Sequence, residues 1–116
     1  MVVLVGTNDS PEGRAALRAG AEEARRRGAE LVWLNVGPRA VDPSWVPDGA
    51  REVVRPEHQD PEAALIDAAS YEHAEVLVIG VRRRSPVGKF LMGSLVQRVI
   101  LDSTVPVLAV KADPSP

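Results

Sequence analysis

Residues 75–110 read EVLVIGVRRRSPVGKFLMGSLVQRVILDSTVPVLAV. An unbroken apolar run, typical of a strand buried on both faces, leads to Gly80. A loop with four cations follows, and Gly93 and Ser94 then open a helical pattern that returns to a second apolar run. The first amides of a helix are unpaired donors at the positive end of its dipole, and glycine lets backbone approach a ligand closely. The stretch therefore predicts a crossover that can bind an anion such as phosphate.

Short apolar runs alternate with helical patterns along the whole chain, which predicts one α/β domain with a parallel sheet. We expect this domain to span residues 1–112 and residues 113–116 to form a disordered tail. Ser10 followed by Pro11, and Asp60 followed by Pro61, predict two helix starts, because serine and aspartate cap helices and proline fits their first position. The expected strands are 2–5, 31–36, 53–54, 76–79 and 105–110.

The overall composition narrows the class of protein. The chain has 116 residues, 14 basic and 16 acidic, and no cysteine. It therefore has no disulfides, and its near-neutral charge gives no electrostatic case for nucleic-acid binding. No apolar run approaches the ~20 residues that a membrane span needs, so we expect no membrane association and a cytoplasmic protein.

The segment between Gly37 and Ala50 is rich in proline. Pro38, Pro43 and Pro47 exclude a long helix there. A short crossover should leave part of one sheet face less covered, and we expect Trp45 to fold onto that gap, near Trp33. Trp45 is interpreted as a structural anchor, with base stacking as the alternative.

The motif at 80–94 resembles that of the universal stress protein family, whose nucleotide-binding members carry glycine, two residues, glycine, nine residues, then glycine with serine or threonine. Gly80, Gly93 and Ser94 match, whereas Arg83 stands at the second glycine. The segments VVLVGTNDSPEGRAAL at 2–17 and LVWLNV at 31–36 also resemble the family's first strand, first helix and second strand. The resemblance implies a Rossmann-like, adenine-nucleotide alpha-hydrolase-like fold with a doubly wound sheet of five parallel strands in the order 3-2-1-4-5.

Ligands of such sheets bind outside the carboxyl ends of the strands where strand order reverses, here between the first and fourth strands. The resemblance implies that ATP binds there, with or without magnesium. The candidate ligand residues are Thr7, Asn8, Val36, Gly80, Arg82, Arg83, Gly93, Ser94, Leu95 and Val96. Besides Arg83, three further positions depart from the family pattern: Asn8 replaces an aspartate, and Asp9 and Gln59 replace glycines.

Several candidates have a second interpretation. Ser94 and Gln97 fit a capping box, which explains the helix start without a ligand, and Leu95, Val96, Val99 and Ile100 would form its buried face. Val36 fits a core position equally well. The basic loop can be a solvated surface, and Arg83 either fills the pocket or clamps a phosphate.

The last apolar run is expected to be an edge strand, and such edges are usually paired or covered. In the family that the chain resembles, this strand pairs with its mate in a homodimer. The resemblance implies an interface at Val105, Val107, Leu108, Ala109 and Val110. The alternative is a lone edge shielded by Pro106 and Lys111.

No catalytic or metal-binding set is recognisable, since His58 and His73 lack ligand spacing and no serine lies in a nucleophile elbow. The sequence therefore predicts a nucleotide-binding module of the stress response that is not an enzyme. One alternative is the same fold with a degenerate pocket, acting through protein contacts as a dimer. A second is a small enzyme of the adenine-nucleotide alpha-hydrolase-like group.

Overall fold

A computed structural model describes residues 1–82 and 93–112 of the chain. Its sheet has five parallel strands in the order β3-β2-β1-β4-β5, as expected. The strands are β1 (Val2–Thr7), β2 (Glu30–Asn35), β3 (Arg51–Glu52), β4 (Val76–Val81) and β5 (Val107–Lys111). The central strands β1 and β4 are almost wholly buried, which explains why they are unbroken apolar runs.

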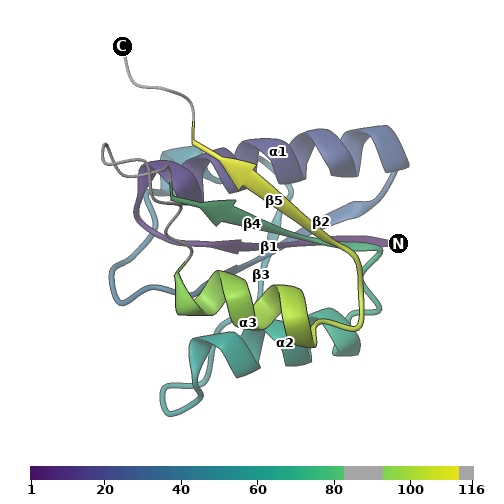
Figure 1. Cartoon of the computed structure of the whole chain (residues 1–116). Helices are drawn as coiled ribbons and strands as arrows, with labels where there is room; N and C mark the ends of the chain where they lie inside the picture. The colour runs from purple at the N-terminus through teal and green to yellow at the C-terminus, as the bar shows by residue number, and fades with distance from the viewer. Residues whose placement is uncertain (83–92, 113–116) are drawn as a thin grey trace.

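Helices cover both faces of the sheet (Figure 1). Helix α1 (Pro11–Arg27) lies on one face, and α2 (Pro61–Tyr71) and α3 (Ser94–Asp102) lie on the other. Each face has its own core. Leu17 of α1 packs in one cluster with Val5, and Leu65 of α2 packs in the other with Leu4.

The two helix starts predicted from serine or aspartate followed by proline are confirmed. The amide of Gly13 donates to the Ser10 hydroxyl oxygen at 3.0 Å, and the amide of Ala63 donates to an Asp60 carboxylate oxygen at 3.1 Å. Helix α1 ends at Gly28, whose φ of 62° is the left-handed conformation that glycine adopts readily. The arginines before it, 25–27, pair with Glu22, Glu23 and Glu75 on the surface.

The proline-rich crossover contains only a three-residue 3₁₀ helix, η1 (Pro43–Trp45). Trp45 and Trp33 both pack, half-buried, against the α1-side core, so the expected anchoring of Trp45 on this face is confirmed. The Arg14 guanidinium carbon lies 5.7 Å from the centre of the Trp45 ring. This cation–π contact joins the crossover to α1.

The position of the third strand was predicted wrongly. It lies at Arg51–Glu52 instead of 53–54, and pairs Glu52 with Trp33. The Val53 amide donates to the Trp33 carbonyl at 2.8 Å, and Val54 is exposed. Backbone pairing with β2 therefore determines the position of this short edge strand. The apolar side chains of the two valines do not determine it.

The last segment also differs from its prediction. Val105 precedes β5 in a turn, where its amide donates to the Ser103 hydroxyl oxygen at 3.1 Å. Ile100 is 44% exposed and therefore is not part of the buried face of α3, which Val96 and Val99 form. Within the described ranges, no helix is long and apolar enough to cross a membrane.

Candidate functional site

The carboxyl ends of β1 and β4 lie next to each other at one edge of the sheet. β1 pairs with β2 on one side and with β4 on the other, so strand order reverses beside it. Helix α1 follows β1 and lies on one face of the sheet, and α3 lies on the opposite face (Figure 1). This edge is where open α/β sheets bind ligands.

The loop after β1 folds back on the start of α1. Thr7 is buried, and its hydroxyl donates to the Gly13 carbonyl at 2.8 Å. The Ser10 hydroxyl donates to Asn8 Oδ1. A Cβ on Gly13 would lie 2.1 Å from the Asn8 carbonyl oxygen, so this close return requires glycine. Because Asn8 Oδ1 already accepts a bond, the side-chain N–H groups are the donors that Asn8 can offer to a ligand.

The ends of β1 and β2 are linked across the edge. Val36 follows β2, and its amide donates to the Thr7 carbonyl at 2.8 Å. Its half-buried side chain packs against the α2-side core. Arg39 Nε lies 3.0 Å from Asp9 Oδ2, and Asn35 donates to the Arg39 carbonyl at 2.8 Å. Asp9, which departs from the family pattern, therefore holds the β2 loop in place.

Arg39 and Gly13 were not predicted from the sequence. The Asp9–Arg39 pair joins residues 30 positions apart, and no local pattern marks Arg39. Gly13 belongs to a Ser-x-x-Gly helix start, but this spacing carries no functional signal by itself. Both residues shape the β1 loop through contacts that only the folded chain reveals.

Gly80 and Arg82 lie at the end of β4, near the first turn of α1. A Cβ on Gly80 would lie 2.1 Å from the Glu12 carbonyl oxygen, so the glycine allows the helix to approach the strand. Arg82 Nε is 3.9 Å from a Glu12 carboxylate oxygen, and the arginine side chain is 82% exposed. Its guanidinium therefore remains accessible to an anion. Arg83 lies outside the described residues.

The N-cap residue of α3 has no side chain with which to cap the helix. Gly93 is the N-cap residue, with φ −64° and ψ 157°, and makes no side-chain cap bond. The predicted capping box is wrong, because Ser94 is the first helical residue and not the cap. Ser94 is exposed, Leu95 half-buried and Val96 buried. Among the described residues, no atom lies within 4 Å of the position that a Cβ on Gly93 would occupy.

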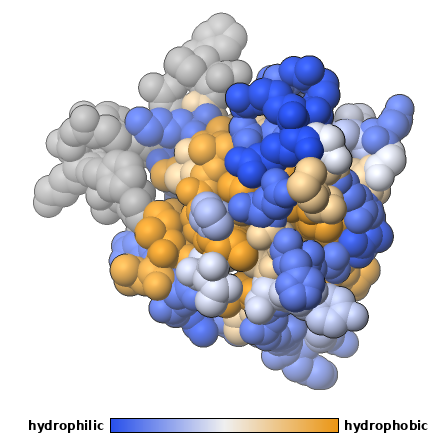
Figure 2. Space-filling view, turned by 90° about the vertical axis from the view of Figure 1, so that its right-hand side faces the viewer, coloured by the Kyte–Doolittle hydropathy of each residue, from blue (hydrophilic) through white to orange (hydrophobic). Residues whose placement is uncertain are grey.

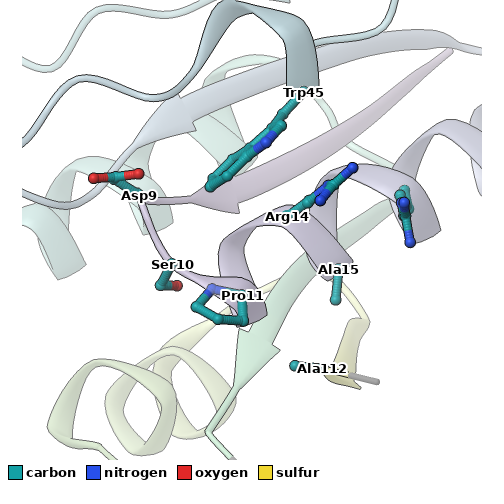
Figure 3. A pocket seen from close by; sticks show the side chains of 8 residues that line it. Asp9, Ser10, Pro11, Arg14, Ala15, Trp45 and Ala112 are labelled. Carbon is teal, nitrogen blue, oxygen red and sulfur yellow. The ribbon is translucent and has the colours of Figure 1, made fainter. Parts of the chain in front are cut away.

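A hollow of about 380 Å³ adjoins the β1 loop on the α1 side (Figure 3). Trp45 and Arg14 face each other across it, and Asp9, Ser10 and Pro11 line its other side. No cluster of acidic or histidine side chains that could hold a metal ion occurs among the residues described.

An open, doubly wound parallel sheet with helices on both faces defines an α/β protein of the Rossmann-like class. A model of the universal stress protein family matches residues 1–53 and 44–111. The chain is 38% identical to a universal stress protein of Mycolicibacterium smegmatis, over 95% of this chain and 97% of the relative. The chain therefore belongs to the universal stress protein family.

Solved structures show the same architecture. A universal stress protein from Archaeoglobus fulgidus is 29% identical and superposes with a TM-score of 0.77, covering 95% of this chain and 97% of that one. A structure of the universal stress protein from Archaeoglobus fulgidus in complex with dAMP is 25% identical with a TM-score of 0.69, covering 95% and 96%. The fold is the adenine-nucleotide alpha-hydrolase-like fold of these proteins.

Proposed function

We propose that this chain binds ATP at the carboxyl edge of the sheet, between β1 and β4, with the phosphates at the first turn of α3. The observation that carries the proposal is the start of α3 at Gly93, a residue with no side chain to cap the helix, and no described atom lies within 4 Å of its Cβ position. The amides of Leu95 and Val96 are the donors, and the helix dipole favours the negative charge. The dAMP complex of the Archaeoglobus fulgidus relative supports an adenine nucleotide as the ligand class.

Asn8 and Arg82 give the proposed site its particular chemistry. Asn8 offers N–H donors to the nucleoside end, because its oxygen is held by Ser10. Arg82, at the end of β4, is exposed and supplies a cation for the phosphates, with magnesium as their counter-ion. Val36 closes the nucleoside end with its backbone, as the family resemblance implies.

We propose further that the bound nucleotide is not turned over at an appreciable rate. Both hydroxyls of the β1 loop are committed to protein acceptors: Thr7 donates to Gly13, and Ser10 donates to Asn8. A hydroxyl held this way lacks the adjacent base that activates a nucleophile. Release of inorganic phosphate from ATP at a rate above that of a Gly93→Asp control would contradict this part of the proposal and favour the enzyme alternative.

Titration calorimetry with ATP, with and without magnesium, and with AMP in parallel tests the binding proposal. We expect saturable binding of ATP and markedly weaker binding of AMP, because AMP cannot place β- and γ-phosphates at the α3 amides. Absence of heat and of thermal stabilisation at millimolar ATP would contradict it.

A second function, a homodimeric interaction module, is favoured by the apolar surface near β5. Ile100 and Leu101 at the end of α3 are exposed, and so is Leu108 of β5. Figure 2 shows hydrophobic surface gathered over one part of the face in view, while hydrophilic surface occupies another part. β5 is the last strand of the sheet order, so pairing with a second copy would bury its edge. We propose that Val107, Leu108, Ala109 and Val110, with Val105 at their start, form this contact.

A further inference from the structure

The short crossover leaves a second cavity, distinct from the proposed nucleotide site. It measures about 580 Å³ and lies between the β2–β3 edge and the loop of residues 40–49. This volume is within the roughly 300–1,000 Å³ of typical small-molecule sites. Its lining residues are Trp33, Asn35, Ala40, Val41, Pro43, Val46, Pro47, Asp48, Gly49 and Glu52.

The cavity lies on the α1 face of the sheet, whereas Val36 packs against the opposite core. Trp33, Val41 and Val46 all pack with the α1-side cluster, and they give the cavity an apolar lining. Asn35 is already satisfied: its oxygen accepts from the Gly37 amide at 2.9 Å, and its nitrogen donates to the Arg39 carbonyl. The charged side chains of the lining are the two carboxylates of Asp48 and Glu52.

Glu52 stands beside the indole of Trp33. The two residues are direct partners in the parallel ladder of β2 and β3, so their side chains leave the sheet on the same face. Asp48 approaches from the loop. No lysine or arginine belongs to the lining, and within residues 1–82 and 93–112 neither Asp48 nor Glu52 forms an ion pair. The neighbouring Arg51 is engaged by Glu30 and Glu72.

We infer that this cavity binds a small organic cation, a molecule with an ammonium group and an apolar body. Two carboxylates without an ion-pair partner among the described residues attract the positive group, and the indole of Trp33 in the lining is an aromatic group that can contact a cation. The apolar residues of the lining remove the body of the ligand from water. An anionic molecule of the same shape is repelled by both carboxylates.

The test uses phenethylamine as the probe, with phenethyl alcohol and phenylpropionate as neutral and anionic molecules of similar shape. In a Trp45→Phe variant Trp33 is the remaining tryptophan, since the chain has two, and its fluorescence reports on the cavity. We expect a saturable change with phenethylamine that weakens as salt is added, and no saturation with phenylpropionate. Equal responses to all three probes, or no saturable response to the amine, would overturn the inference.

Charge-removing variants identify the groups responsible. Asp48 and Glu52 are exposed, so Asp48→Asn with Glu52→Gln removes both charges without disturbing the core. Their loss should weaken amine binding at least about tenfold, equivalent to ~1.4 kcal/mol. Glu57→Gln, at an exposed position outside the cavity, is the matched control and should bind normally. Unchanged binding in the double variant would overturn the inference. The outcome is independent of ATP binding, because no lining residue belongs to the proposed nucleotide site.

Discussion

Two glycines of the motif, Gly80 and Gly93, have different physical roles. Gly80 is required by the fold, because its missing side chain admits the Glu12 carbonyl. Gly93 adopts backbone angles open to any residue, and a Cβ there would meet no atom of the described residues. Contacts among the described residues and backbone conformation therefore do not require glycine at position 93, whereas the phosphate contact that we propose would require it.

Substitution by alanine should separate these roles. Gly80→Ala should destabilise the protein by about 1–3 kcal/mol, because the new methyl group forces α1 away from β4. Gly93→Ala is the matched control and should change stability much less, because its Cβ points into open space. Denaturant unfolding measures both. Equal losses of stability would show that the close contact of Gly80 with Glu12 is not a constraint.

Gly93→Asp should affect stability and binding in opposite directions. Aspartate is a good N-cap at these backbone angles, so the free energy of unfolding should rise by a few tenths of a kcal/mol. ATP binding should fall sharply, because the new carboxylate occupies and repels the phosphate position. Gly93→Ser adds a cap without a charge and should weaken binding less. ATP affinity unchanged in Gly93→Asp, measured by calorimetry, would place the phosphates elsewhere.

At the scale of elements, helix ends are where local sequence is most informative. The Ser10–Pro11 and Asp60–Pro61 starts were predicted because the cap and the first proline are adjacent in sequence. The start of α3 was misplaced by one residue, since both Gly93 and Ser94 are acceptable caps and backbone angles alone decide between them. β3 was misplaced because its pairing depends on β2, which is distant in sequence.

The cap of α2 links its stability to pH. The bond from the Ala63 amide holds the pKa of Asp60 below its ordinary value of 3.8, and Arg98 at 3.1 Å acts in the same direction. A carboxylate whose pKa is lower in the folded state stabilises the protein above the unfolded pKa, and this stabilisation is lost as pH falls through the folded value.

Asp60→Asn keeps an oxygen acceptor for the cap but cannot titrate. We therefore expect the variant to be less stable than the natural chain near neutral pH, and the difference to disappear below the folded-state pKa of Asp60. Thermal unfolding followed across this range measures the effect. A difference that persists unchanged in acid would show that the charge of Asp60 is not its source.

At the scale of the whole molecule, the strand order followed from the alternation of elements and from the family resemblance. The long-range contacts near the carboxyl ends of the strands could not be predicted in this way. The Asp9–Arg39 pair and the contact of Gly80 with Glu12 join segments that only the folded sheet brings together. Likewise, the exposure of Ile100 could not be read from its helical spacing, which places it beside the buried face.

The β5 edge gives a prediction for the assembled protein. Leu108→Lys places a charge on a strand residue that is 36% exposed, and should convert a dimer to a monomer, because unpaired lysine protects edges from pairing. Val54→Lys, at an apolar position that is 74% exposed and outside the sheet, is the control and should leave the mass unchanged. Light scattering after size-exclusion chromatography measures both. An unaltered mass in Leu108→Lys would contradict pairing through β5.

The most direct test of the central claim is an amide-resolved NMR titration with ATP and magnesium. The account predicts that the amides of Ser94, Leu95 and Val96 shift most, with Val36 and Asn8 shifting at the nucleoside end. It also predicts that AMP leaves the α3 amides nearly unmoved. Saturable shifts confined to other surfaces, or no shifts at saturating ATP, would contradict a nucleotide site between β1 and β4.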